Sequence, residues 1–283
     1  MGRSVMILGA GGQLGREITK LYHDSIPVYH SKSDNHLNLN LMDFENLKRL
    51  IEDRKPDILI NCSAYTNVDR CETQKFDALN INALSVREMS RMCNIIGTKL
   101  VHVSTDYVFD GDVGDYKEND IPNPINYYGL TKLLGDCYAE TSEDSLIVRT
   151  SGVYGNSANF PRFVYQTLKS GGEVNALVGF YSPIHAVNLA TAIKELVERN
   201  VKGIFNVAGM RTSRYTFAKA LKQFFELSGS INEVKEFKGM IARRPFDSSL
   251  NTEKARSIVP FDFYSLESSL RQFGESMKEE EGN

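Results

Sequence analysis

The chain has 283 residues, of which 41% are hydrophobic and 24% are charged, and its formal net charge is −3. This balance is typical of a folded globular protein, and a slightly acidic chain is a poor candidate for binding nucleic acid or an anionic membrane surface. No apolar run approaches the roughly 20 residues that span a bilayer, and no signal peptide is recognisable, so we expect a cytoplasmic protein without a membrane segment.

The first half of the chain alternates short apolar runs with helix-like stretches. Because these runs do not alternate with polar residues, they predict strands that are buried on both faces of a parallel sheet. The expected strands are 5–8, 26–29, 57–61, 99–104 and 145–149, and the expected helices are 12–23, 43–54, 72–96 and 127–141. This order predicts an α/β fold with a doubly wound parallel (Rossmann) sheet, in which ligands bind at the carboxyl ends of the strands.

After about residue 150 the alternation is less regular. The expected elements there are a loop leading into a helix over 156–170, a helix over 185–199, a strand over 203–207 and a helix over 215–228. We therefore expect a dinucleotide-binding domain over residues 1–151, which also uses part of 183–210, and a smaller C-terminal lobe, mostly 152–283, that binds substrate. The acidic tail Lys278–Glu281 is expected to be a solvated or frayed end.

The first apolar run is followed at once by a glycine-rich turn, Gly9-Ala-Gly-Gly12-Gln-Leu-Gly15. Glycine permits a positive φ and a close approach of the backbone to a ligand, and the helix that follows presents unpaired N–H groups to a pyrophosphate. The spacing G-x-x-G-x-x-G differs slightly from the usual G-x-G-x-x-G fingerprint. A tight turn without a ligand would show the same glycines, but the position after the first strand favours a dinucleotide.

The end of the second expected strand bears on which dinucleotide is bound. NAD sites usually place a carboxylate there to bind the ribose 2′-hydroxyl, and here none precedes Asp34. Ser31 and Lys32 are suited instead to the 2′-phosphate of NADP, although both are also ordinary surface-loop residues. The sequence therefore favours NADPH, with NADH as the alternative.

A second motif, Tyr128-Gly-Leu-Thr-Lys132, lies at the start of a later expected helix. Residues four apart share one helix face, so the Lys132 ammonium is expected to lower the Tyr128 pKa from its usual value of about 10. Thr105, just after the fourth strand, is placed to hold a substrate carbonyl in line with the Tyr128 hydroxyl. This arrangement predicts hydride transfer to a carbonyl, with Tyr128 as the proton donor and Lys132 on the nicotinamide ribose. The pattern Y-x-x-x-K is common by chance, and Tyr127 is the alternative if the helix register differs by one residue.

The remaining polar residues give weaker signals. His102 and His185 lack metal-ligand spacing, so we expect structural roles for both and no metal site. The four cysteines contain no C-x-x-C pair, which favours reduced thiols over disulfides or zinc. Asp106 and Asp110 are not spaced like a glycosidase pair, and G-x-S-x-G is absent, so a hydrolase is not expected.

Taken together, the motifs resemble the extended short-chain dehydrogenase/reductases, and longer segments resemble the dTDP-4-dehydrorhamnose reductase family. The most specific segment is Ser104-Thr-Asp-Tyr-Val-Phe-Asp-Gly111, and the others are Asn61–Asp69, Arg149–Gly155 and Arg244–Leu250. The resemblance covers nearly the whole chain. It implies NADPH-dependent reduction of the 4-keto group of a dTDP-4-keto-6-deoxy sugar, giving dTDP-L-rhamnose, and it allows a homodimer.

The resemblance also implies roles for individual residues. Thr105, Tyr128 and Lys132 would be catalytic. The cofactor would contact Gly9, Gly12, Gln13, Leu14, Gly15, Asn40, Cys62, Ser63, Ala64, Tyr65 and Asn82, as well as Tyr128 and Lys132. The substrate would contact Thr66, Val68, Thr105, Asp106, Tyr107, Gly152 and Arg244.

The chain departs from the family pattern at three positions. Gly152 stands where the family usually has a Trp that packs against the substrate, Asn40 where it has an Asp near the adenine, and Ile184 where it has a Thr on the substrate side. These departures leave the sugar open and keep two alternatives. One is a non-catalytic NADP-binding subunit resembling the one that binds methionine adenosyltransferase, and the other is a nucleotide-sugar epimerase, which would keep NAD bound through purification.

Overall fold

The structure is a computed structural model that describes residues 2–30, 36–155, 157, 159–235 and 239–281. Ser31 and Lys32, on which the preference for NADPH depends, lie outside these residues. Across the described ranges, no helix is both long enough and apolar enough to cross a membrane.

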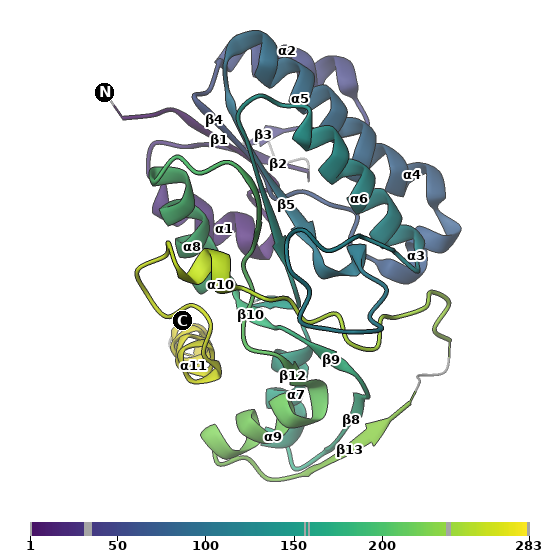
Figure 1. Ribbon diagram of the computed structural model, residues 1–283. Coiled ribbons are helices and arrows are strands. Elements are labelled where there is room, and N and C mark those ends of the chain that lie inside the picture. Colours follow the sequence, from purple (N-terminus) through teal and green to yellow (C-terminus); the bar gives the residue numbers. More distant parts are fainter. Residues whose placement is uncertain (1, 31–35, 156, 158, 236–238, 282–283) are drawn as a thin grey trace.

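A seven-stranded parallel sheet occupies the centre of the molecule, in the order β11-β6-β5-β4-β1-β2-β3 (Figure 1). Its strands are β1 (Val5–Leu8), β2 (Ile26–Tyr29), β3 (Leu37–Asn38), β4 (Ile58–Asn61), β5 (Lys99–Thr105), β6 (Ser145–Thr150) and β11 (Gly203–Asn206). The strand order reverses at β1, which pairs with β2 on one side and β4 on the other. The doubly wound α/β fold is therefore confirmed, and β1 is the switch point where ligands bind in such sheets.

Helices cover both faces of this sheet (Figure 1). One face packs against α2 (Phe44–Arg54), α5 (Ser85–Ile96) and α6 (Tyr127–Glu140), and the other against α1 (Gln13–Leu21) and α8 (Ala186–Glu198). Successive side chains of a strand point to opposite faces, so each strand contributes to two cores. Ile7 packs with α1 and α8, whereas Met6 and Leu8 pack with α2 and α5, and this double burial explains why the strands are apolar throughout.

The expected helix over 72–96 is wrong as a single element. The chain there forms α3 (Val68–Thr73), α4 (Lys75–Leu79), the π-helical turn η1 (Asn80–Leu84) and α5. Within η1, the Asn82 side chain binds the Tyr65 backbone in both directions, accepting from its N–H at 2.7 Å and donating to its carbonyl at 3.2 Å. A π turn adds a residue to one turn and so changes which side chains face a neighbour, and such turns recur near functional sites.

The second half builds a smaller layer and also returns to the sheet through α8 and β11. Its further elements are β7 (Val153–Tyr154), α7 (Phe160–Lys169), β8 (Glu173–Leu177), β9 (Phe180–Tyr181), β10 (Ile184–His185), β12 (Thr212–Ser213), α9 (Arg214–Phe224), β13 (Ser230–Val234), α10 (Glu253–Arg256) and α11 (Leu266–Glu281). The sequence patterns did not predict β8, β13 or α11. Helix α11 extends to Glu281, and Leu270, Phe273 and Met277 anchor it in a core with Tyr154. Lys278 is exposed, as expected for a solvated end.

Candidate active site

A cavity of about 980 Å³ opens at the carboxyl ends of the central strands. Most of the predicted site residues lie on its wall. They are Gly9, Gly12, Gln13, Leu14, Asn40, Cys62, Ser63, Ala64, Tyr65, Thr66, Val68, Thr105, Asp106, Tyr107, Tyr128, Lys132 and Gly152. Of the predicted residues that the structure describes, Gly15, Asn82 and Arg244 are not on this wall.

The glycine turn between β1 and α1 forms one end of the cavity. Gly9 has a φ of +81°, and a Cβ there would lie 2.6 Å from Ser63 Oγ. A Cβ on Gly15 would collide with the Gly9 carbonyl, so Gly15 allows helix α1 to pack closely on the turn. Gly12 caps α1 without a side-chain hydrogen bond, and the first turn of the helix has no acidic residue. The first N–H groups of α1 are therefore open to an anion, as a pyrophosphate requires.

The second half of the chain reaches this turn through Gln13. The Gln13 Oε1 accepts from Asn159 Nδ2 at 3.1 Å and from the Ser157 N–H at 3.3 Å. Asn159 is also the N-cap of α7, where its Oδ1 accepts from the Arg162 N–H at 3.0 Å. Asn159 and Ser157 both line the cavity, and no sequence motif pointed to either of them.

The reacting residues come from β5 and α6. Thr105 is the last residue of β5, and its side chain hydrogen-bonds with Tyr128 on α6. Helix α6 can approach the end of β5 closely because Gly129 has no side chain; a Cβ there would collide with the Tyr107 carbonyl. Tyr128 lines the cavity, whereas the Tyr127 ring lies under the Lys75 ammonium, 5.3 Å from its centroid. The geometry thus favours Tyr128 over Tyr127 as the phenol that faces a ligand.

The expected lowering of the Tyr128 pKa is not found. Burial raises the pKa of Tyr128, and the hydrogen bond with Thr105, which lowers it, does not compensate. The negative charge of Asp106 raises it further. A phenol surrounded by protein loses hydration that its charged form needs, so Tyr128 is a neutral phenol at pH 7.

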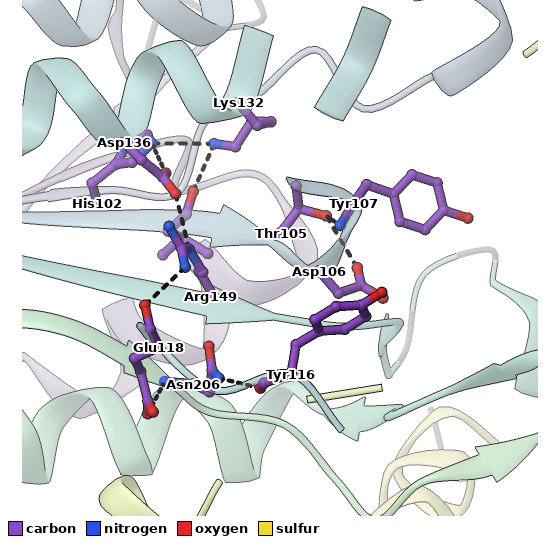
Figure 2. Close-up of polar contacts among 11 residues, drawn as sticks. His102, Thr105, Asp106, Tyr107, Tyr116, Glu118, Lys132, Asp136, Arg149 and Asn206 are labelled. Atoms are coloured by element: carbon purple, nitrogen blue, oxygen red, sulfur yellow. Dashed lines mark hydrogen bonds and ion pairs between the residues drawn. The ribbon is translucent and has the colours of Figure 1, made fainter. Parts of the chain in front are cut away.

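Lys132 is almost fully buried and is held by β5. Its Nζ donates to the Val103 carbonyl at 2.7 Å and lies 3.3 Å from His102 Nε2 (Figure 2). Burial lowers the pKa of Lys132 to about 8, although Asp136 and Cys62 oppose the shift. His102, which we expected to have a structural role, therefore contacts a predicted catalytic side chain directly.

Asp106 lines the cavity next to Thr105. Its carboxylate accepts hydrogen bonds from Thr105 Oγ1 at 3.1 Å, Ser151 Oγ at 2.7 Å and Ser248 Oγ at 2.5 Å. These hydroxyls come from three separate parts of the chain, so Asp106 ties the end of β5 to the second half. Burial raises the pKa of Asp106 while the hydroxyls lower it.

Asn82 and Arg244 act behind the wall. Both polar atoms of Asn82 serve the Tyr65 backbone, and its Nδ2 also donates to Thr131 Oγ1 at 3.1 Å. Arg244 donates to Asp69 Oδ2 at 2.9 Å, which ties the segment after β13 to α3. Asn82 thus supports the wall residue Tyr65 directly. Arg244 holds Asp69, which is not on the wall but lies between the wall residues Val68 and Arg70.

The wall at Gly152 has a backbone conformation and a neighbouring ring that leave no room for a side chain. Gly152 has a φ of +49°, and a Cβ there would lie 2.8 Å from the Tyr181 ring. Arg214, the first residue of α9, lies over the Tyr181 ring, with its guanidinium carbon 4.6 Å from the ring centroid. Tyr181 and Arg214 both line the cavity, and neither belongs to a recognisable motif. The space beside Gly152 is therefore filled by an aromatic ring from β9.

The sequence favours reduced thiols and no metal site. All four cysteines are free, with Cys71 and Cys93 buried, Cys62 partly buried and Cys137 exposed. Over the described part of the chain, no cluster of three or more His, Cys, Asp or Glu side chains could hold a metal ion.

Comparison with known proteins places this architecture in a family. A family model described as the RmlD substrate binding domain matches residues 3–278. The crystal structure of a hypothetical dTDP-4-dehydrorhamnose reductase from Sulfolobus tokodaii is 49% identical, with a TM-score of 0.89 over 92% of this chain and 96% of that one. The dTDP-4-dehydrorhamnose reductase of Bacillus anthracis, solved in complex with NADP, is 29% identical, with a TM-score of 0.88 over 97% and 99% of the two chains.

Two curated proteins extend the comparison. The dTDP-4-dehydrorhamnose reductase of Aggregatibacter actinomycetemcomitans is 32% identical over 294 residues, covering 96% of this chain and 99% of its own. Methionine adenosyltransferase 2 subunit beta of Xenopus laevis is 29% identical over 273 residues, covering 89% of this chain and 81% of its own. By the extent of these matches, together with the family model, the chain belongs to the RmlD, or dTDP-4-dehydrorhamnose reductase, family.

Proposed function

We propose that the chain reduces the 4-keto group of a nucleotide-activated 6-deoxy sugar with NADPH, as in the conversion of dTDP-4-dehydrorhamnose to dTDP-L-rhamnose. Its family makes it an oxidoreductase that acts on a nucleotide-sugar keto group. One observation carries the finer proposal, namely that Thr105, Tyr128 and Lys132 line the same cavity as the Gly9–Gly12 turn. Hydride transfer to a carbonyl needs a dinucleotide cradle and a proton donor within one site.

The residues present fit a nicotinamide dinucleotide. The uncapped N–H groups at Gln13 and Leu14 would hold its pyrophosphate. The absence of a Cβ at Gly9 and Gly12 keeps the turn open for the close approach of the phosphates. Asn40 and the residues Cys62–Tyr65 line the cavity beyond the carboxyl ends of β3 and β4 and would contact the rest of the cofactor. When bound, the reduced nicotinamide supplies the hydride. Solved relatives support this assignment, since the Bacillus anthracis reductase binds NADP.

Tyr128 supplies the proton in this proposal. Its raised pKa keeps the phenol neutral, which is the form that can protonate the oxygen of a reduced carbonyl. Thr105 hydrogen-bonds with Tyr128 and holds the substrate oxygen in line with its hydroxyl. The Lys132 ammonium binds the nicotinamide ribose and stabilises the phenolate that remains after proton transfer.

The first test is to follow loss of NADPH absorbance with dTDP-4-dehydrorhamnose for the unmodified chain and for Tyr128→Phe. Loss of the hydroxyl removes the proton donor, so we expect kcat to fall by about 10²- to 10⁴-fold while NADPH still binds. NADPH binding, measured by fluorescence in both proteins, is the control. Reduction by the variant at the unmodified rate would remove Tyr128 from the mechanism, and no turnover despite NADPH binding would rule out this substrate.

The same assay with NADH tests the cofactor preference, which depends on residues 31 and 32.

Two other functions are distinguished by simple measurements. The similarity to methionine adenosyltransferase 2 subunit beta supports a regulatory subunit as the second candidate. Capture of a methionine adenosyltransferase, together with no turnover of any keto sugar, would favour it. An epimerase would retain NAD through purification, which an absorbance spectrum of the denatured protein would reveal.

The assembly and location expected from the sequence remain predictions. A homodimer would have about twice the chain mass of 31.8 kDa, which light scattering during gel filtration measures directly. A cytoplasmic location is tested by fractionation of the cells that make the protein. We propose no nucleic-acid or membrane partner.

A further inference from the structure

A buried polar chain runs from the cofactor wall to Lys132 by way of Asn61 and His102. The Ser63 N–H donates to Asn61 Oδ1 at 3.1 Å, and Asn61 Nδ2 lies 3.2 Å from His102 Nδ1. Both side chains are completely inaccessible to solvent. Buried polar groups of this kind are costly unless they are hydrogen-bonded, and the proposed reaction does not by itself explain why they are here.

The order of these contacts determines where His102 carries its proton. Because Asn61 Oδ1 accepts from the Ser63 N–H, the amide NH₂ of Asn61 faces His102 Nδ1, and that nitrogen must accept. The ring is neutral because burial, together with the charge of Lys132, lowers the pKa of His102 well below 6.5. A neutral imidazole that accepts at Nδ1 carries its proton on Nε2.

The Nε2–H of His102 faces two side chains of helix α6. Nε2 lies 3.3 Å from Lys132 Nζ and 3.8 Å from Asp136 Oδ1, and Figure 2 shows the ring contacting both. Lys132 and Asp136 are four residues apart on one helix, the spacing at which opposite charges usually pair. No such pair forms between these two described residues. Lys132 donates to a carbonyl of β5, and Asp136 pairs through Oδ2 with Arg149 at 3.1 Å.

The second carboxylate oxygen of Asp136 is therefore available to a donor. Asp136 Oδ1 is buried and has no hydrogen-bond partner among the described residues. Three donors lie near this carboxylate: the Ser104 hydroxyl, which lowers the pKa of Asp136, the His102 Nε2–H and, after rotation of its side chain, the Lys132 ammonium. The choice between these donors decides whether Lys132 stays with β5 or pairs along its own helix.

We propose that His102 is a positioning residue that keeps Lys132 from pairing with Asp136 and so holds the ammonium at the cavity wall with Tyr128. The Nε2–H cannot accept from the ammonium, and although 3.8 Å is too long for a hydrogen bond, its positive end faces Asp136 Oδ1. With the Lys132 ammonium 3.3 Å away, the ring lies close to both charged groups and fills space that direct pairing would need. Gly135 leaves room for this ring, since a Cβ there would lie 3.3 Å from His102 Nε2 and would collide with the Asn82 carbonyl. The catalytic consequence rests on the proposed function, whereas the positioning itself does not.

Loss of this contact has a measurable effect on Lys132. The titratable groups that face its Nζ are His102 from β5, Asp136 from α6 and Cys62 from the end of β4. Burial holds the Lys132 pKa at about 8 in the observed arrangement. Direct pairing with Asp136 would stabilise the charged form, so the Lys132 pKa would rise.

A matched pair of substitutions tests the proposal on the full chain. In His102→Gln, the side-chain amide reaches the position of Nε2 and keeps a donor toward Asp136. In His102→Asn, the shorter amide keeps a partner for Asn61 but removes the N–H that faces Asp136 and the ring that fills the space between Asp136 and Lys132. A purely structural role in joining β4 to β5 would make the Asn variant the milder one, whereas positioning of Lys132 would make the Gln variant the milder one.

The primary readout is the Lys132 pKa, measured by NMR titration of its side chain without any sugar substrate. We expect His102→Asn to raise it by about one unit or more and His102→Gln to leave it near that of the unmodified chain. Adding Asp136→Asn to His102→Asn should return the pKa toward its starting value, because the competing carboxylate is then neutral. Equal shifts in the two single variants, or a double variant that stays raised, would overturn the proposal.

Turnover gives an independent readout. With NADPH and dTDP-4-dehydrorhamnose, His102→Asn should lose about 100-fold in kcat with little change in KM, and His102→Gln should lose much less. If the chain turns over no keto sugar, the titration still decides the positioning, so the two proposals fail separately. If His102→Asn does not fold, His102→Gln alone is decisive, because a raised Lys132 pKa in that variant contradicts the proposal.

Discussion

Tyr128 and Lys132 lie four residues apart on α6, and burial favours the neutral form of each. For the phenol, this means a raised pKa and a retained proton. For the ammonium, it means a pKa lowered to about 8, close to the pH at which enzymes are usually assayed. A buried Lys that acts only in its charged form therefore loses its charge, and its function, when the pH rises modestly above neutral.

The pH dependence of cofactor capture tests this sensitivity. Lys132 is charged below its pKa of about 8 and neutral above it, so kcat/KM for NADPH should be highest below that pH and should fall as the pH rises through it. This ratio reports groups of the free enzyme, so bound cofactor does not perturb the reading. The measurement is NADPH oxidation between pH 6 and pH 10. A profile that stays flat to pH 10 would show that the Lys132 ammonium is not required, and Lys132→Met should be low at every pH.

At this scale, the sequence predicted residues that belong to motifs and missed those that do not. Thr105 and Tyr128 follow recognisable patterns, and both line the cavity. Arg214 and Tyr181 line it as well, but they come from the smaller layer, and nothing local distinguishes an Arg at a helix start from a solvated one. The contact of His102 with Lys132 was not predicted, because it joins β5 to α6, and sequence spacing alone does not show which side chains of two elements meet.

At the scale of elements, helix caps make hydrogen bonds that hydrophobic periodicity in the sequence does not predict. His185 is the N-cap of α8, and its Nδ1 accepts from the Val187 N–H at 3.3 Å. Burial lowers the pKa of His185 to about 4, with a further contribution from Lys20. The cap works only while the ring is neutral, because a protonated imidazole cannot accept.

This cap predicts a specific loss of stability in acid. The unfolded chain binds the His185 proton near pH 6.5 and the folded chain only near pH 4, so its contribution is complete above pH 6.5 and is lost as the pH falls toward 4. Between pH 7.5 and pH 5 we expect the free energy of unfolding to fall by about 2 kcal/mol from this group. Urea unfolding at both pH values measures it. In His185→Asn, which keeps a capping side chain without a titrating ring, the fall should be smaller by that amount. Equal falls in the two proteins would contradict the assignment.

The elements that the sequence failed to predict have physical explanations. Strands β8 and β13 pair with each other in the smaller layer, and the residues of β13 are largely exposed, so they lack the apolar signature of the central strands. The π turn η1 depends on Asn82 binding the Tyr65 backbone, which is a tertiary contact. The central strands were predicted well because strands that are buried on both faces consist of continuous apolar runs, which are visible in the sequence.

At the scale of the whole molecule, the cofactor half is not complete by itself. Helix α8 and strand β11 come from the second half, yet Leu189, Ile193 and Phe205 belong to the same core as Ile7 and Leu14. We propose that the dinucleotide-binding domain consists of residues 1–151 together with α8 and β11, and that the rest of 152–283 forms the substrate lobe.

A fragment comprising residues 1–151 should therefore not fold. It would leave the α8 face of the sheet exposed and β6 without its neighbour β11, and large exposed apolar surfaces and free strand edges promote aggregation. We expect no cooperative thermal transition by circular dichroism, whereas the full chain should show one. A fragment that melts cooperatively and binds NADPH would mean that the two halves are independent.

The contact between Gly152 and the Tyr181 ring also constrains how this protein could have diverged from its relatives. A lineage with Trp at position 152 cannot hold Tyr181 where it lies here, and a chain with Tyr181 in place has no room for any side chain at 152, let alone an indole. A larger residue at 152 therefore requires a smaller residue at 181 or a displaced ring, so the two positions are coupled. An alignment inspected one column at a time would record Gly152 as a loss of side-chain volume, although the Tyr181 ring fills the space beside it.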